Sequence, residues 1–272
     1  MKKELLTDLT ESQAKKKIRG NLGKHIECPK CHRKKYVKRM KGKDKRYHCS
    51  KCRHKFSLKS LTGFKHSNLD FKQIYYLLHC FGNNKTHKDV IDWLGVSYPT
   101  SRLNYSKIRK GLELSLDKEK ISGIFVCDEC FVGKQKTGNQ ALVMGGVDQT
   151  FFDVRLEVIP DRGQDSIEGF LDKNFYSDSL IISDGYTSYG DIEFMGYAHD
   201  NEVHAKGQFE KTVPIERVWG LFKTFLRRSY HHIHKETLPE YLVEFQFKFI
   251  HRKYRHNPLY IAKILTNPVP NC

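Results

Sequence analysis

The chain has 272 residues, of which 39% are hydrophobic and 12% aromatic, and a formal net charge of +17. This apolar content is enough for a folded core, which excludes a wholly disordered chain. No apolar run approaches the roughly 18 residues of a membrane span. The first twenty residues lack the apolar stretch and cleavage site of a secretion signal. The high positive charge makes a polyanion the first partner to consider.

The positive charge is confined to the N-terminal part of the chain. Residues 1–120 hold 31 Lys and Arg against 11 Asp and Glu, a net charge of +20, and residues 121–272 hold 17 against 20, a net charge of −3. The pattern predicts a cationic binding region joined to a near-neutral domain with a separate task. A solvated basic surface that only aids solubility is the alternative.

The chain begins with a basic segment, residues 1–23, which we expect to be an amphipathic helix in part. Residues 24–64 follow, and the motifs CPKC and CSKC in this region are separated by seventeen residues. This is the spacing of a four-cysteine zinc ribbon. A hairpin with its turn near residues 41–43 would bring four thiolates around a structural Zn²⁺ ion. Free thiols in an unstructured loop are the alternative; the predicted ligands are Cys28, Cys31, Cys49 and Cys52.

Residues 65–120 are predicted to form a helical DNA-binding domain. Apolar residues have helical spacing over 70–83, and a later helix is expected to end at Leu94, before a turn at Gly95. Ser97 is a suitable N-cap for the next helix, and Pro99 fits its first turn. The pattern is that of a helix-turn-helix, whose second helix enters a DNA groove, and a plain structural hairpin is the alternative. The candidate DNA contacts are Arg102, Asn104, Lys107 and Arg109.

Residues 121–265 show the alternation of strands and helices that predicts an α/β domain with a mixed sheet, and residues 266–272 form a tail. Three successive strands, a helix over 165–175 and a short strand ending at Asp184 are followed by a loop-rich stretch and two amphipathic helices. A third pair, Cys127 and Cys130, falls within the first strand. Side chains three apart on a strand face opposite ways, so we expect two buried thiols rather than a second metal site.

Three carboxylates are positioned to converge in this domain. Asp128 lies in the first strand, Asp184 ends the fourth, and Glu216 opens a helix. Convergent carboxylates require neutralising cations, and a pair of Mg²⁺ or Mn²⁺ ions would meet that need. Lys223 lies two helical turns after Glu216 on the same face and is a candidate phosphate contact; an ordinary surface lysine is the alternative. Spacing alone does not separate these acids from the others in this half of the chain.

The segments CDECFVGK, SDGYTSY and VPIERVWGLFK, in this order, with YHHIH, EYLVEFQFKF and the upstream YHCSKCRHKFSLKSLTGF, resemble the insertion-sequence DDE transposases that carry an N-terminal zinc ribbon. This ISXO-type group is related to the Merlin transposons, and the resemblance spans roughly residues 25–255. It implies an RNase H-like, retroviral-integrase-like core. It assigns the two aspartates and the acidic third position to Asp128, Asp184 and Glu216, and the motif lysine to Lys223.

The resemblance also implies a function. We expect a Mg²⁺- or Mn²⁺-dependent DNA transposase that binds the terminal inverted repeats of an insertion sequence, cleaves the strand and joins it to target DNA as at least a dimer. No membrane partner is expected, and the protein would act in the cytoplasm with the bacterial nucleoid, or in the nucleus of a eukaryote. The alternatives are a DNA-binding regulator without catalysis and a structure-selective nuclease of the same fold. The pair His231–His232 recurs in the group, and its role stays open.

Overall fold

The computed structural model describes residues 9–41, 46–116, 119–184, 189, 191–202, 211–230 and 233–266. The chain divides into two compact units, one made of Met1–Ser115 with Lys253–Cys272 and the other of Leu116–Arg252. The sequence predicted a catalytic domain that ran to residue 265. The end of that range belongs instead to the first unit, because helix α8 (Pro258–Thr266) packs against helices from the N-terminal part.

The first unit is built on helices α1 (Glu11–Gly20), α2 (Phe71–Gly82), α4 (Tyr98–Glu113) and α8. Thr10 and Gln13 form a capping box at the start of α1, and the helix buries Ala14 and Ile18. Helix α1 packs on α2 and α8, and α4 also contacts α8. The helix expected in the basic N-terminal segment is therefore confirmed for Glu11–Gly20.

The predicted pair of helices with a glycine turn is confirmed. Helix α3 (His87–Leu94) ends at Gly95, which has the left-handed φ of 65° that favours glycine. Ser97 then caps α4 by accepting a hydrogen bond from the backbone N–H of Thr100 at 3.4 Å. Pro99 lies in the first turn of α4, where its missing N–H removes no helical bond.

A small antiparallel sheet accounts for the cysteine-rich region. Strands β1 (Val37–Arg39), β2 (Tyr47–Cys49) and β3 (Lys55–Phe56) lie in the order β1-β2-β3. Val37 pairs with Cys49 and Arg39 with Tyr47, so the expected hairpin between the two CxxC motifs is confirmed. Its predicted turn at residues 42–43 lies outside the described residues.

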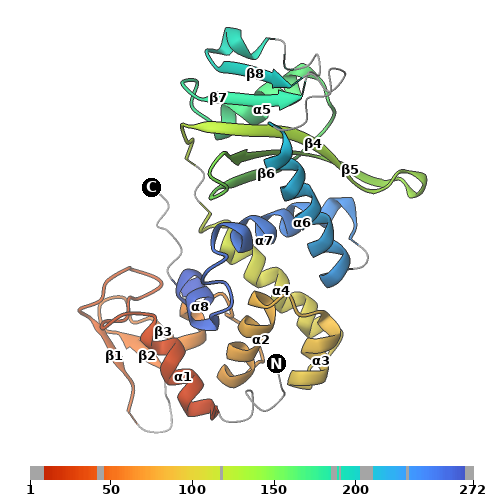
Figure 1. The fold of residues 1–272 in the computed structure, drawn as a ribbon. Coiled ribbons are helices and arrows are strands. Elements are labelled where there is room, and N and C mark those ends of the chain that lie inside the picture. The colour runs from red at the N-terminus through yellow and green to blue at the C-terminus, as the bar shows by residue number, and fades with distance from the viewer. Residues whose placement is uncertain are drawn as a thin grey trace. The chain divides into compact units, whose positions relative to one another are not determined.

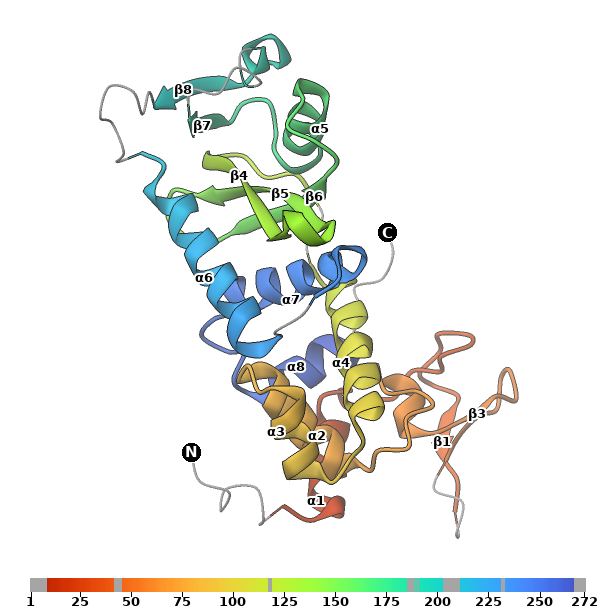
Figure 2. The ribbon, with the colours of Figure 1, turned by 90° about the vertical axis from the view of Figure 1, so that its right-hand side faces the viewer.

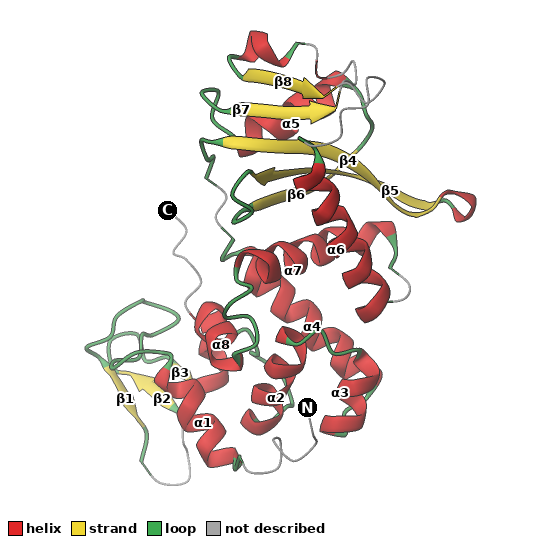
Figure 3. Cartoon of the chain, viewed as in Figure 1, coloured by secondary structure: helices red, strands yellow, loops and turns green. Residues whose placement is uncertain are grey.

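The second unit contains a five-stranded mixed sheet (Figures 1 and 3). Its strands lie in the order β6-β5-β4-β7-β8. The pairs β4–β5 and β5–β6 are antiparallel, whereas β4–β7 and β7–β8 are parallel. This strand order is that of an RNase H-like core, and the predicted α/β class is confirmed; the strands are β4 (Ile124–Lys134), β5 (Asn139–Asp148), β6 (Val154–Ile159), β7 (Leu180–Asp184) and β8 (Ala198–Glu202).

Strand β8 is a correction to the sequence prediction, which assigned this stretch to loops. Its five residues, AHDNE, show no alternation of apolar and polar side chains. A strand at the edge of a sheet pairs on one side only and needs little apolar content, so β8 gave no periodic signal. The pairing with β7, from Leu180↔Ala198 to Asp184↔Glu202, defines it.

Helices cover both faces of this sheet. Helix α5 (Gln164–Asn174) lies on one face, and α6 (Val213–Ser229) with α7 (Leu238–Ile250) lies on the other, as Figure 2 shows. Two adjacent glycines of β5 mark the faces. A Cβ atom on Gly146 would lie 2.6 Å from the Phe175 ring, and one on Gly145 would lie 2.6 Å from the indole of Trp219. Each helix layer therefore presses an aromatic ring directly onto the backbone of the central strands.

None of the described helices is both long and apolar enough to cross a membrane.

Candidate active site and zinc site

Two of the predicted catalytic carboxylates lie on neighbouring parallel strands. Val126 of β4 pairs with Ile182 of β7, and Asp128 and Asp184 each follow two residues later on the same face of the sheet. Burial raises the pKa of Asp128, and the negative charge of Asp184 adds to the increase against the opposing effect of a hydrogen bond from Trp219. The fold thus brings together two acids that are 56 positions apart in the sequence.

Helix α6 contacts this pair through an aromatic side chain. The indole Nε1 of Trp219 donates a hydrogen bond to Oδ2 of Asp128 over 2.9 Å. Trp219 is 5% exposed and lies over Gly145, which pairs directly with Asp128 across the β4–β5 ladder. The absence of a side chain at Gly145 leaves room for the indole beside the carboxylate.

The two remaining predicted catalytic residues lie on α6, on either side of Trp219. Glu216 precedes it by three residues and Lys223 follows it by four, which are spacings that place side chains on one helix face. Glu216 is exposed in the first turn of the helix. Lys223 interacts with the Cys130 thiol on β4; burial raises the pKa of that thiol, and the lysine charge opposes the increase.

The chemistry of these oxygen ligands fits a hard divalent cation. Carboxylate oxygens are preferred by Mg²⁺ and Mn²⁺, and a cation would relieve the repulsion between Asp128 and Asp184 that contributes to the raised pKa of Asp128. Among the described residues, however, the four cysteines form the only group of three or more His, Cys, Asp or Glu whose ligand atoms all lie within 4.8 Å of one another. Glu216 is therefore not drawn into a compact triad with the two aspartates in this structure.

Sequence reasoning missed Trp219 and Gly145. A signal was present, because Trp219 lies between Glu216 and Lys223 at helical spacing. Nothing in the sequence, however, indicated that its N–H would meet Asp128. The third cysteine pair behaves as expected: Cys127 belongs to the hydrophobic cluster under α5, and Cys130 lies on the other face beside Lys223. The pair His231–His232 lies outside the described residues.

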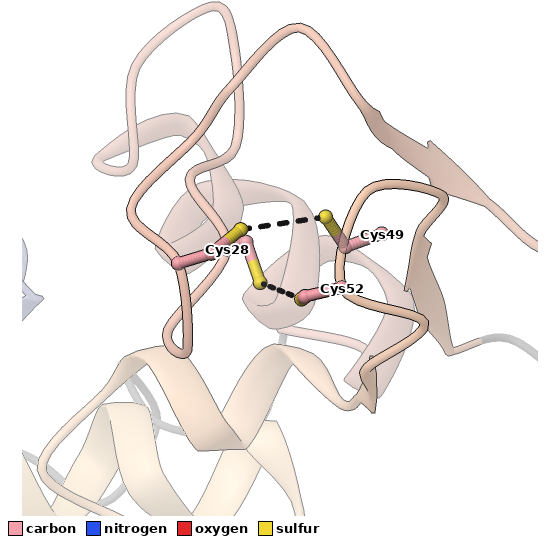
Figure 4. Close-up of side chains that lie close together, drawn as sticks. Cys28, Cys49 and Cys52 are labelled. Carbon is pink, nitrogen blue, oxygen red and sulfur yellow. Dashed lines mark hydrogen bonds between the residues drawn. The ribbon is translucent and has the colours of Figure 1, made fainter.

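The four N-terminal cysteines form a cluster of metal-binding geometry. Their sulfur atoms lie within 4.8 Å of one another, with 3.5 Å between Cys28 and Cys52 and 3.6 Å between Cys31 and Cys49. A tetrahedral Zn²⁺ ion with Zn–S bonds of about 2.3 Å requires sulfur separations of roughly 3.8 Å. Figure 4 shows the labelled Cys28 on one turn and Cys49 and Cys52 on the other, with their sulfur atoms directed toward the same region. The arrangement therefore fits a zinc ion.

The two cysteine turns have matching backbones. The residue after the second cysteine of each motif, His32 or Arg53, has a positive φ of 56°. This left-handed conformation is uncommon outside glycine. The backbone N–H of His32 donates to the carbonyl of Cys28 at 2.9 Å, which closes the first turn. Both motifs contain the same left-handed residue, which costs conformational free energy. Binding of one metal ion by the two turns would offset that cost.

The residues predicted to contact DNA divide into two pairs in α4. Arg102 is exposed, and Lys107 is partly exposed. Asn104 and Arg109 are each 2% exposed. Asn104 accepts a hydrogen bond from the Ser67 hydroxyl at 3.1 Å and donates one to the Thr100 carbonyl at 2.8 Å. Asn104 and Arg109 therefore stabilise the first unit and do not lie on the outer face of α4.

One family model and several solved structures are similar to parts of the chain. Residues 123–249 match the family model of the ISXO2-like transposase domain, which confirms the resemblance for this part of the chain. No curated protein matches. Solved structures similar to the chain include the catalytic core of BIV integrase, with 12% identity over 44% of this chain and 80% of that one and a TM-score of 0.32. The HTLV-2 integrase core in complex with magnesium has 11% identity over 48% and 87%, with a TM-score of 0.33.

A simian T-cell lymphotropic virus intasome in complex with the PP2A regulatory subunit B56 gamma also matches, with 13% identity over 64% of each chain and a TM-score of 0.37.

Proposed function

We propose that this protein is a DNA transposase that moves an insertion sequence, because residues 123–249 match the family model of the ISXO2-like transposase domain. It binds the terminal inverted repeats of the element, cleaves the DNA strand at the element end and transfers that end to target DNA. Synapsis of two ends requires at least two copies of the chain. The protein acts where its DNA is, in the cytoplasm of a bacterium or the nucleus of a eukaryote.

The first unit supplies the contacts with DNA in this proposal. The net charge of +20 over residues 1–120 favours contacts with phosphates, which provide most of the affinity and make it salt-dependent. The zinc ribbon and the α3–α4 pair hold the element end. Arg102 and Lys107 on the accessible side of α4 are the groove and backbone contacts.

The second unit carries the chemistry. Asp128, Asp184 and Glu216 would hold Mg²⁺ or Mn²⁺, and such a cation would supply activation of the nucleophile and stabilisation of the leaving oxygen in phosphoryl transfer. The positions of Asp128 and Asp184 on adjacent parallel strands are the observation that carries the proposal. Glu216, in the first turn of α6, would complete the ligand set. Lys223 neutralises a phosphate close to the reacting bond.

The test is cleavage of a labelled duplex that contains the element end, in the presence of Mg²⁺. Asp128→Asn should abolish strand cleavage and leave end binding intact, because the substitution removes the charge that holds the cation and keeps the shape of the side chain. Asp172→Asn is the matched control. Asp172 is an exposed residue of α5 that pairs with Lys120 at 2.8 Å, and its substitution should leave cleavage unchanged. Cleavage by Asp128→Asn at the wild-type rate would refute the assignment.

A strand-transfer assay separates the proposal from its alternatives. A transposase joins the cleaved end to a target plasmid, a nuclease of the same fold cuts without joining, and a regulator binds without cutting. Joined products that depend on Mg²⁺ and on Asp128 are the expected result.

A further inference from the structure

Trp219 joins the helix that carries two of the proposed catalytic residues to the strand that carries the first aspartate. Its Nε1–H donates to Oδ2 of Asp128 at 2.9 Å, and it lies three residues after Glu216 and four before Lys223 on α6. Within the second unit, this hydrogen bond connects α6 directly to the middle of β4.

The indole of Trp219 occupies space that the glycine at position 145 of β5 leaves open. A Cβ atom on Gly145 would lie 2.6 Å from Cη2 and 2.8 Å from Cζ2 of Trp219, and 2.8 Å from Cδ2 of Leu156. Real Cβ atoms do not approach other atoms so closely, so an indole in this position requires glycine at 145. The ring is held from the sheet side, and its N–H has little freedom to turn away from Asp128.

We propose that Trp219 is a positioning residue for Asp128: its indole N–H, which donates to Oδ2, fixes the carboxylate in the orientation in which it would hold a divalent cation. A carboxylate ligand that rotates freely must lose that freedom on binding a cation, and an outer hydrogen bond removes this cost beforehand. The same bond couples the placement of Glu216 and Lys223 to that of Asp128. This inference rests on the proposed role of Asp128 as a metal ligand.

A packing role alone predicts a different behaviour. A buried tryptophan normally places its N–H on some acceptor, and in that case the phenyl ring of Trp219→Phe would fill most of the space that the indole occupies without changing the affinity for metal. The positioning role predicts that loss of the N–H weakens metal binding even when the fold is intact. Metal affinity, rather than stability, therefore decides between them.

The experiment measures Mn²⁺ binding to the full chain with its zinc site loaded, by the electron paramagnetic resonance signal of free Mn²⁺. Trp219→Phe removes the donor, and Gly145→Ala displaces the indole while leaving every proposed ligand in place. We expect each to raise the Mn²⁺ concentration for half-saturation of the Asp128-dependent site by about 10- to 100-fold. Thermal unfolding of each variant verifies that it is folded, and Trp219→Phe decides alone if Gly145→Ala does not fold.

Two matched controls come from the chain itself. Trp93→Phe makes the same substitution in α3 of the other unit. Gly220→Ala adds a methyl group on α6 where nothing lies within 4 Å. Both should bind Mn²⁺ as the wild type does.

The Trp93→Phe variant also provides a direct signal, because it leaves Trp219 as the single tryptophan of the chain. Paramagnetic Mn²⁺ bound at Asp128 should quench the fluorescence of Trp219. The Mn²⁺ concentration for half-maximal quenching should equal the one measured by electron paramagnetic resonance, and Asp128→Asn should abolish the quenching. Wild-type Mn²⁺ binding by Trp219→Phe, with binding lost in Asp128→Asn, would overturn the positioning role and leave the proposed function intact. Wild-type binding by Asp128→Asn would overturn both.

Discussion

Glu129 and Arg162 form an ion pair on the face of the sheet opposite Asp128, with 3.1 Å between Oε2 of Glu129 and Nη2 of Arg162. The side chain of Glu129 is 1% exposed, whereas that of Arg162 is 36% exposed. Strand alternation thus separates two consecutive acids into different environments. Burial raises the pKa of Glu129, and Arg162 opposes that increase through a hydrogen bond and its charge.

Removal of this partner should destabilise the second unit. Arg162→Ala leaves a buried carboxylate without its counter-charge, and we expect a loss of about 3 kcal/mol in the free energy of unfolding at neutral pH, the lower end for a broken buried pair. Without Arg162 the pKa of Glu129 rises further. The deficit should therefore shrink as the pH falls and Glu129 takes up a proton. Urea unfolding of wild type and variant between neutral and acidic pH measures this.

The control for the ion pair is a double-mutant cycle. In a Glu129→Gln background the residue at 162 no longer faces a negative charge, so Arg162→Ala should cost much less there. An equal cost in both backgrounds would show that Arg162 stabilises the fold through other contacts.

In the absence of Mg²⁺, the ionised Asp128 side chain should lower the free energy of unfolding. Its pKa in the folded state is raised, chiefly by burial, so the folded protein holds the proton more tightly than the unfolded chain does. Stability then falls as the pH rises from the unfolded pKa through the folded pKa, and the cost persists at neutral pH. Asp128→Asn should raise the melting temperature of the metal-free protein at pH 7 and have little effect below the unfolded pKa of about 4.

With Mg²⁺ added, the wild type should have the higher melting temperature and Asp128→Asn the lower one. The wild type gains stability from ligand binding to the folded state, and Asp128→Asn gains less because its site lacks a charged ligand. Calorimetric scans with and without Mg²⁺ measure both effects. A melting temperature of Asp128→Asn at or below that of the metal-free wild type at pH 7 would contradict the pKa direction.

The chain should bind one Zn²⁺ ion, and the four cysteines of the ribbon should be its ligands. Metal analysis of the purified chain should give about one Zn²⁺ per chain, and replacement of Cys28 and Cys49 by Ser should remove it, because two sulfur ligands do not hold the ion. Cys130→Ser is the control, since this thiol belongs to the second unit, where it lies beside Lys223. Retention of zinc by the double variant, or its loss from Cys130→Ser, would contradict the assignment.

Two arginines of α4 should behave differently. Arg102 is exposed, so Arg102→Ala should weaken binding to the element end and reduce the salt dependence by about one phosphate contact, with no change in melting temperature. Arg109 is 2% exposed, and its guanidinium lies 6.0 Å from the centre of the Tyr105 ring. Arg109→Ala should destabilise the first unit by about 2 kcal/mol. Mobility-shift titrations at several salt concentrations, with melting curves, test the pair.

The sequence alone was sufficient where local patterns carry the information. The spacing of Cys28, Cys31, Cys49 and Cys52 indicated the metal cluster, because two tight turns place thiolates without help from distant residues. Gly95 and Ser97 marked the helix pair, because a left-handed C-terminal residue and an N-cap are properties of single positions. Strand β8 was missed, since an edge strand requires no apolar periodicity.

The residues that surround the candidate active site were decided by tertiary structure. Alternation within β4 separates Asp128 from Glu129 and could be read from the sequence. Only strand order and register bring Asp184 beside Asp128, and only the packing of α6 on Gly145 brings the indole of Trp219 to its carboxylate. These contacts join positions 56 to 91 residues apart, and no local pattern encodes which of several acids will share a face. Which acids lie together is decided when different helices bury the two faces of the sheet.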